Sequence, residues 1–257
     1  MLADAGVEVG GPCLSREQAL ADNPAFFHRA RTARPHVAAK LAMSLDARIA
    51  VLEGERSRIT GKAAHAEVHR IRAYHDAIMV GARTAEVDNP LLTARGDVQP
   101  GTPPIRIVLD VDARLALSSR LVETVEEAPV WVFCGEGVDE TRLEELERAG
   151  VSVHPVPSED GALDLRAVVS VAADLGVTSI LCEGGGRTVD GLMEAGLIDR
   201  LYLFVAPVVV GDVGVPAFPR SWTGSGAPVG GRAGHGWRPI TSPSRFGDDI
   251  LAIWDRF

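Results

Sequence analysis

The chain has 257 residues, of which 46% are hydrophobic and 24% are charged, and its formal net charge at pH 7 is -9. This length and hydrophobic content suffice for one large α/β domain with a short appendage. The negative charge argues against nucleic-acid and anionic-membrane partners, so we expect the protein to bind a small molecule. A phosphorylated ligand would then need specific arginines in its pocket.

The cysteines and the N-terminus indicate where the protein works. Cys13, Cys134 and Cys182 are odd in number and lack C-x-x-C spacing, which argues against a disulfide framework and a zinc site. We expect all three to be buried thiols in a reducing compartment. The N-terminus lacks the features of a signal peptide, and no apolar run approaches the roughly 18 residues of a membrane helix. The sequence therefore predicts a cytoplasmic protein.

Residues 1–35 differ in character from the rest of the chain. A helix end and a short strand are expected at the start, followed by a Gly-Gly-Pro turn. A capped helix then begins near Ser15 and covers residues 15–31. We interpret residues 1–35 as an appendage that precedes the main domain, residues 36–257.

From residue 36 onward, apolar segments rich in β-formers alternate with amphipathic segments. The predicted strands are 36–43, 76–82, 105–110, 129–134, 178–184 and 200–211, and the predicted helices are 60–74, 139–149, 164–175 and 187–196. Strands that are apolar at nearly every position suit a sheet covered on both faces. The order predicts a three-layer α/β fold with a mostly parallel central sheet and helices on both faces.

The C-terminal part of the chain departs from this alternation. The last ten residues, DDILAIWDRF, predict a final antiparallel strand at the edge of the sheet, beside the strand at 200–211. The stretch 212–243 is rich in Gly, Pro and Ser, which predicts a long irregular loop with a functional role.

A glycine-rich turn gives the strongest local signal. The predicted strand 178–184 runs into Glu183 and three glycines, Gly184 to Gly186, before a helix opens at Arg187. Glycines let backbone N–H groups approach an anion, and a helix N-terminus suits a diphosphate. The spacing is neither that of a Walker loop nor G-x-G-x-x-G, so a plain strand-to-helix turn remains the alternative.

Two arginines flank the next candidate segment. Arg72 lies near the end of a predicted helix and Arg95 follows a loop, and together they could clamp a phosphate. The alternative is that each is an ordinary surface arginine. The same helix carries His65 and His69 at metal-ligand spacing, but no third ligand is apparent and we predict no metal site.

A lysine within a strand is the third signal. Lys40 lies in the predicted strand 36–43, where a buried ammonium must find a partner. Glu183 is the candidate, because open α/β sheets gather their ligand-binding residues at the carboxyl edge. A purely structural ion pair is the alternative.

Taken in chain order, these segments resemble the reductase domain of the bifunctional riboflavin-biosynthesis deaminase/reductase. The resemblance starts near residue 34 and includes a lysine strand running into Ser-Leu-Asp, the stretch VGARTAEVDNPLLTAR, PIRIVLD, and Glu-Gly-Gly before a helix. It implies a dihydrofolate-reductase-like fold and NADPH-dependent reduction of C1′ of 5-amino-6-(5-phosphoribosylamino)uracil, which opens the ribose to a ribityl chain.

The resemblance also implies roles for individual residues. Matching cofactor positions are Ala42, Thr84, Asp88, Gly185, Gly186, Arg187, Thr188, Val189, Asp190 and Gly191, and matching substrate positions are Arg72, Leu92, Arg95 and Glu183. We expect Lys40 and Glu183 to form the catalytic pair. Arg58 or Arg187 is available to a 2′-phosphate, and Arg56 occupies a substrate position.

The sequence departs from the family pattern at one loop in particular. The family has Ser-x-Trp where this chain has Arg56-Ser57-Arg58, a family glycine is replaced by Arg83, and another by Ala47. These changes leave open a specialised-metabolism homologue that reduces a different imine or carbonyl.

Residues 1–35 resemble the tail of the preceding deaminase domain. The deaminase zinc signature, H-x-E with P-C-x-x-C, is absent from the sequence, so we expect no deamination. A further alternative is an inactive nucleotide-binding partner of a separate deaminase. The apolar run 200–211 could face a second copy, and a homodimer is the expected assembly.

Overall fold

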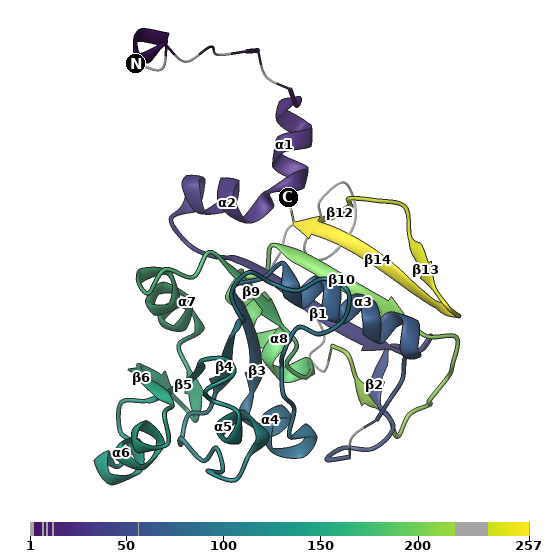
Figure 1. The fold of residues 1–257 in the computed structure, drawn as a ribbon. Helices are drawn as coiled ribbons and strands as arrows, with labels where there is room; N and C mark the ends of the chain where they lie inside the picture. Colours follow the sequence, from purple (N-terminus) through teal and green to yellow (C-terminus); the bar gives the residue numbers. More distant parts are fainter. Residues whose placement is uncertain are drawn as a thin grey trace.

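The computed structural model of the chain describes residues 3–6, 8, 10–11, 13–55, 57–218 and 236–256. One large sheet dominates it (Figure 1). In spatial order its strands are β12 (Trp237–Pro239), β14 (Asp249–Arg256), β10 (Arg200–Val205), β1 (His36–Met43), β9 (Ser179–Cys182), β3 (Ala77–Gly81), β4 (Ile105–Leu109), β5 (Val130–Gly135) and β6 (Ser152–Val156), and β13 (Ser244–Phe246) pairs with β14. Neighbouring strands are parallel from β10 to β6, which confirms the mostly parallel sheet.

Helices cover both faces of this sheet. On one face lie α3 (Lys62–Ala73), α4 (Ala82–Asp88), α5 (Arg120–Glu123) and α6 (Glu140–Arg148), and on the other lie α7 (Leu165–Asp174) and α8 (Gly186–Glu194). Strand residues alternate between the two layers: Ala38 of β1 packs toward α3, whereas Val37 and Ala39 pack toward α7 and α8. The predicted three-layer arrangement is confirmed.

The helix predicted for residues 15–31 is divided in two. Its start is as expected, because Ser15 and Gln18 form a capping box for α1 (Arg16–Asp22). The chain then breaks at Asn23, whose side chain accepts a hydrogen bond from the Phe26 N–H and caps α2 (Pro24–Thr32). Pro24 suits the first position of a helix but not a helix interior, so one continuous helix was the wrong prediction. A short 3-10 helix, η1 (Ala3–Ala5), precedes these helices, and the strand expected there falls partly outside the described residues.

The C-terminal edge also differs from the prediction. The antiparallel pairing of β14 with β10 is confirmed, but β14 does not lie at the edge, because β12 and β13 pair with its other side. The strand predicted for 200–211 ends at Val205. Residues 212–243 are not wholly irregular: β11 (Val215–Pro216) pairs with β2 (Arg48–Ala50), and β12 lies in the same stretch, whereas 219–235 fall outside the described residues.

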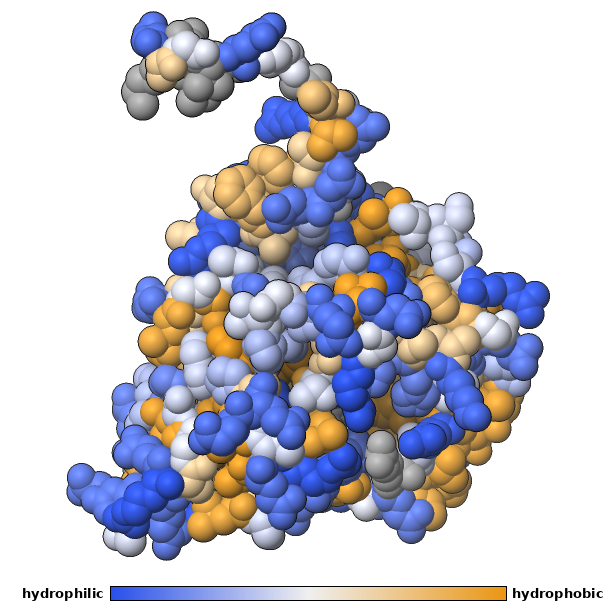
Figure 2. Space-filling model, in the orientation of Figure 1, coloured by the Kyte–Doolittle hydropathy of each residue, from blue (hydrophilic) through white to orange (hydrophobic). Residues whose placement is uncertain are grey.

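Several short elements carry too little periodicity to be predicted. They are α4, α5, β2, β6, and the hairpin of β7 (Ser158–Glu159) and β8 (Ala162–Leu163). Among the cysteines, Cys134 and Cys182 are buried as expected, but Cys13 is exposed. None of the described helices has the length and hydropathy needed to cross a membrane. Figure 2 shows a mainly hydrophilic surface on the viewed face, with scattered apolar residues.

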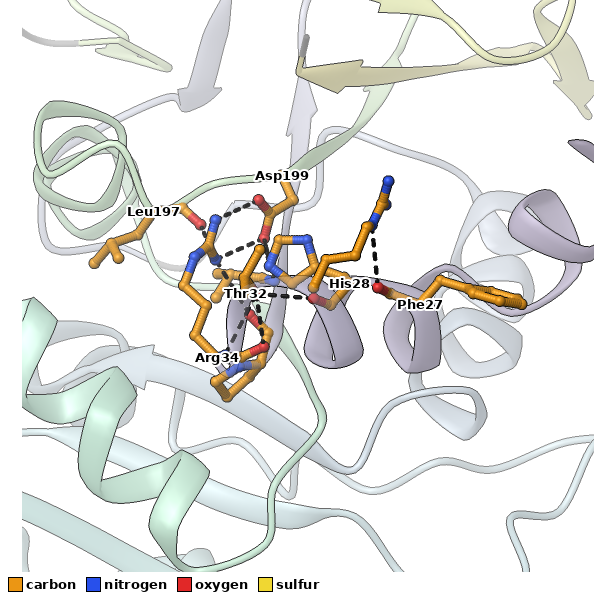
Figure 3. A network of polar contacts seen from close by, with 9 residues as sticks. Phe27, His28, Thr32, Arg34, Leu197 and Asp199 are labelled. Atoms are coloured by element: carbon orange, nitrogen blue, oxygen red, sulfur yellow. Dashed lines mark hydrogen bonds and ion pairs between the residues drawn. The ribbon is translucent and has the colours of Figure 1, made fainter. Parts of the chain in front are cut away.

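The segment before β1 is fastened to the main body, although α1 and η1 project from it (Figure 1). Arg29 of α2 donates hydrogen bonds to the carbonyl of Ala173, in the last turn of α7, and to that of Val177, which follows the helix, both at 3.1 Å. Arg34 forms a bidentate pair with Asp199, with distances of 2.8 and 2.6 Å (Figure 3). Asp199 also accepts the Val37 N–H at 2.9 Å, so one carboxylate links this segment to the start of β1.

Candidate active site

A buried carboxylate lies between two cations where β9 ends. Glu183 Oε1 accepts a hydrogen bond from Arg72 Nε at 2.5 Å, and Glu183 Oε2 accepts one from Arg72 Nη2 at 3.1 Å. Lys40 Nζ lies 3.4 Å from Glu183 Oε2. The side chain of Glu183 is only 6% exposed, and those of Lys40 and Arg72 are 17% and 13% exposed. We call these three residues the buried cluster.

Strand alternation explains why these residues meet. Lys40 shares the face of β1 with Ala38, and Glu183 continues the face of Leu181 on the neighbouring strand. Both faces lie beneath α3, from which Arg72 reaches down beside the buried Ile71. The expected proximity of Lys40 to Glu183 is confirmed. The structure shows in addition that Arg72 binds the same carboxylate.

The electrostatics keep Glu183 ionised. Burial by itself would raise the pKa of this carboxyl group, but the charges of Arg72 and Lys40, with their hydrogen bonds, lower it to about 2. The carboxylate is therefore ionised at neutral pH. It acts as an acceptor that fixes the positions of two cationic side chains.

A loop with an unusual backbone lies beside the buried cluster. Leu92 is 3% exposed and has φ +52°, in the left-handed region that a non-glycine residue seldom adopts. The next carbonyl, that of Thr93, accepts a hydrogen bond from Arg72 Nη1 at 3.0 Å and lies 3.1 Å from His69 Nδ1. Burial, then the charges of Arg72 and Arg95, lower the pKa of His69. The charges of Arg72 and Arg95 both act on this neighbourhood, and Arg95 is exposed to solvent.

The glycine-rich turn brings two helix starts together. The N-cap of α8 is Gly185, which makes no side-chain capping bond, and its N–H lies 3.3 Å from Thr84 Oγ1 of α4. Thr188 packs closely on two other glycines: a Cβ at Gly81 would lie 2.6 Å from Thr188 Oγ1, and one at Gly184 would lie 2.8 Å from Thr188 Cβ. These positions therefore require glycine, which lets the ends of β3 and β9 approach α8.

This turn fits the phosphates of a nicotinamide dinucleotide. The first turn of α8 contains no acidic residue, and the N–H groups of Gly186 and Arg187 precede its first backbone hydrogen bond, which Thr188 donates to the Gly185 carbonyl at 3.0 Å. A Cβ built at Gly185 would have Thr84 Oγ1, at 3.8 Å, as its nearest neighbour, so the turn leaves open space at its mouth. The buried cluster lies at the adjacent end of β9.

The structure describes the remaining predicted site residues except Arg56. Ala42 is half-buried on β1, two residues beyond Lys40, and Asp88 is the last residue of α4. Val189 and Asp190 are 0% and 1% exposed, so their side chains face the interior. The structure places Gly186 and Gly191 within α8, Arg58 and Arg187 at the surface, and Arg56 outside the described residues.

A second carboxylate between two cations was not predicted. Glu53 Oε1, in the loop after β2, lies 3.8 Å from Arg83 Nη2 of α4 and 3.4 Å from Arg187 Nη2 of α8. All three side chains are exposed, by 61%, 56% and 83% respectively. We call them the surface cluster. Two members of this cluster carried a signal in the sequence, Arg83 as the substitution of a family glycine and Arg187 as a predicted cofactor residue, whereas nothing marked Glu53.

Comparison with known families gives a consistent answer. The family model described as the RibD C-terminal domain matches residues 35–222. A riboflavin biosynthesis protein RibD from Actinobacillus pleuropneumoniae is 36% identical over 210 residues, which cover 82% of this chain and 55% of that protein. A 2,5-diamino-6-ribosylamino-4(3H)-pyrimidinone 5′-phosphate reductase from Methanothermobacter thermautotrophicus is 34% identical over 180 residues, which cover 69% of this chain and 80% of that protein.

Solved structures agree with the sequence comparison. Acinetobacter baumannii RibD superposes with a TM-score of 0.82 at 25% identity, covering 100% of this chain and 67% of that one. By contrast, the matched region covers 55% of the RibD protein from Actinobacillus, so the chain spans little more than half the length of that relative. The dihydrofolate-reductase-like fold implied by the sequence resemblance is confirmed. On these grounds the chain belongs to the family of RibD C-terminal domains.

Proposed function

We propose that the protein is the NADPH-dependent reductase of riboflavin biosynthesis and that it acts on 5-amino-6-(5-phosphoribosylamino)uracil. The observation that carries this proposal is the buried cluster, which places an ionised glutamate and a lysine beside a turn suited to a dinucleotide. The named reductase among the relatives supports the reaction class.

Binding follows from the placement of the predicted residues. The N–H groups at the start of α8 would receive the cofactor diphosphate, with Thr84 and Asp88 of α4 alongside. Ala42 is the small residue on β1 that would let the nicotinamide approach. Arg95, with Leu92 at its loop, would bind the substrate phosphate, because Arg72 is already engaged by Glu183 and Thr93.

The buried cluster would supply the proton for the reaction. NADPH, when bound, would supply a hydride to C1′ of the ribosylamine. As the bond from C1′ to the ring oxygen O4′ breaks, its electron pair passes to O4′, which must gain a proton. Lys40 Nζ carries that proton and is held 3.4 Å from Glu183 Oε2, so we assign it as the general acid. Glu183 orients Lys40 and can accept a hydrogen bond from the substrate.

A second function follows from the surface cluster. Arg83, together with the Arg56-Ser57-Arg58 loop, replaces residues typical of the family with cations. A specialised-metabolism homologue that reduces a different imine or carbonyl would explain these substitutions. If the protein were an inactive nucleotide-binding partner of a separate deaminase, the buried cluster would have no catalytic function.

Oxidation of NADPH, followed by its absorbance, separates these functions. Stoichiometric oxidation with 5-amino-6-(5-phosphoribosylamino)uracil supports the proposal. A second assay uses 2,5-diamino-6-ribosylamino-4(3H)-pyrimidinone 5′-phosphate, the substrate named for the Methanothermobacter relative, and tests whether the chain accepts that base instead. Oxidation only with other carbonyl compounds would favour the specialised homologue. NADPH binding without oxidation by any of them would favour the inactive partner.

The proposal also covers the domain boundaries, the localisation and the oligomeric state of the protein. We assign residues 36–257 to the reductase domain and residues 1–35 to a remnant of a deaminase tail with its linker. A cytoplasmic homodimer is the expected form, and Val208 and Val209, 43% and 72% exposed, are apolar residues available to a second copy. Size measurement in solution tests the dimer, and co-purification tests association with a separate deaminase.

A further inference from the structure

The cations of the surface cluster occupy positions where they do not help to stabilise the fold. Arg83 is the second residue of α4 and Arg187 is the second residue of α8. A cation in the first turn is opposed by the helix dipole, which favours anions there. Exposed ion pairs contribute little to stability, so the cluster is poorly explained as a structural element.

The two helix starts lie close together, so the two charges add. Gly81 and Gly185, the N-caps of α4 and α8, make no side-chain capping bonds, and Thr188 of α8 packs directly on Gly81. Arg83 and Arg187 both approach the same atom, Glu53 Oε1. A single carboxylate therefore offsets two guanidinium groups and the positive end of α8.

The loop that carries Glu53 is shaped to reach this position. Gly54 follows it with φ +83°, and a Cβ there would lie 3.2 Å from Arg83 Nη2. The positive φ is the feature that favours glycine at this position, and the distance shows that the loop backbone runs close to the guanidinium group. Glu53 itself is 61% exposed, so a competing anion can displace it without unpacking the core.

We infer that Arg83 and Arg187 form a phosphate subsite for the cofactor, and that Glu53 occupies this subsite when no cofactor is bound. The inference rests on the proposed nicotinamide cofactor and adds to it the residues that set cofactor choice. A phosphate presents more acceptor oxygens and more charge than one carboxylate, so it replaces Glu53 between the two arginines. Glu53 competes only with a ligand group that enters this subsite, so it lowers the affinity for ligands that place a phosphate there and leaves other ligands unaffected.

The test is equilibrium binding of NADPH, NADH and 2′,5′-ADP to the full chain, followed by fluorescence or calorimetry. Arg83→Gln and Arg187→Gln should each weaken NADPH binding about tenfold, the effect of losing one charge-assisted contact. Glu53→Gln should tighten it about threefold, because an exposed competing ion pair is removed. Matched controls are Arg148→Gln and Glu144→Gln, which break a similarly exposed ion pair on α6 and should change neither affinity.

The comparison of ligands identifies the phosphate. Weakening of NADPH and 2′,5′-ADP with NADH unchanged assigns the arginines to the 2′-phosphate, whereas parallel weakening of NADPH and NADH assigns them to the diphosphate. Unchanged NADPH affinity in both arginine variants would overturn the inference while leaving the reductase proposal standing. If NADPH binding depends on the two arginines but the pyrimidine is not reduced, the phosphate subsite is supported and the reductase proposal is contradicted. If the wild-type chain binds none of the three ligands, both fail.

Discussion

The buried cluster and the surface cluster have the same chemical composition and opposite surroundings. In each, one glutamate lies between two cations, but the side chain of Glu183 is 6% exposed whereas that of Glu53 is 61% exposed. Removing charges from water is costly, so a buried pair is held firmly once formed and leaves a costly charge if broken. An exposed pair is worth little and exchanges readily. Burial thus suits one cluster to fixing reactive groups and the other to releasing a ligand site.

The largest expected effect tests the firmness of the buried cluster. Glu183→Gln removes the carboxylate and leaves Arg72 and Lys40 buried without their anion, which should destabilise the fold by about 3–5 kcal/mol. Urea unfolding measures the loss. Glu53→Gln is the matched control and should leave the urea midpoint unchanged. Equal midpoints for the two variants would remove the distinction between the clusters.

The contribution of Glu183 to the free energy of unfolding should depend on pH. The pKa of Glu183 is about 2 in the folded protein, because Arg72 and Lys40 outweigh the effect of burial, against a usual value of 4.5. Its contribution is complete above pH 4.5 and is lost as the pH falls through 2, a change on the order of 3 kcal/mol. Unfolding free energies of the wild type and Glu183→Gln, measured at falling pH, should converge. A constant gap would contradict the assignment.

The proposed catalytic role of the buried cluster is tested by substitution of its lysine. Lys40→Met should lower kcat about 100-fold through loss of the general acid. Lys62→Met, at the exposed start of α3, is the control, since Lys40 and Lys62 are the two lysines of the chain. Steady-state kinetics with the pyrimidine substrate gives both values. A wild-type kcat in Lys40→Met would reduce the pair to a structural role.

A smaller effect is expected at a carboxylate of intermediate exposure. Asp199 is 14% exposed and pairs with Arg34 (Figure 3). It also accepts a hydrogen bond from the Val37 N–H. Asp199→Asn keeps an acceptor oxygen but loses the charge, so we expect a loss of about 1 kcal/mol. Urea unfolding and the rate of proteolysis near α2 measure it. A loss as large as that of Glu183→Gln would show that exposure does not rank these carboxylates.

The sequence predicted what strand geometry determines. Parallel strands end at one edge, and this rule alone brought Lys40 of β1 to Glu183 after β9. The alternation of apolar segments likewise predicted the layers. In contrast, the contact of Arg72 with Glu183 depends on how far α3 is rotated over the sheet, which periodicity does not fix. Arg72 was therefore predicted as a phosphate ligand without its carboxylate partner.

Contacts between loops and distant helices lay beyond prediction. Glu53 meets Arg187 across 134 residues of chain, and no local pattern relates them. The break at Asn23 is a different case, because Asn-Pro is a recognisable helix start that the longer amphipathic pattern concealed. Strands β12 and β13 are three residues each, so their pairing with β14 supplies the order that their own sequences do not.

The anchoring of α2 has a consequence for anyone who shortens this protein. A chain that began at His36 would lose both Arg29, which binds the carbonyls of Ala173 and Val177, and Arg34, the bidentate partner of Asp199. A chain that began at Asn23 would keep both, together with its own helix cap. The practical limit of trimming is therefore the helix cap at Asn23 rather than the first residue of the sheet.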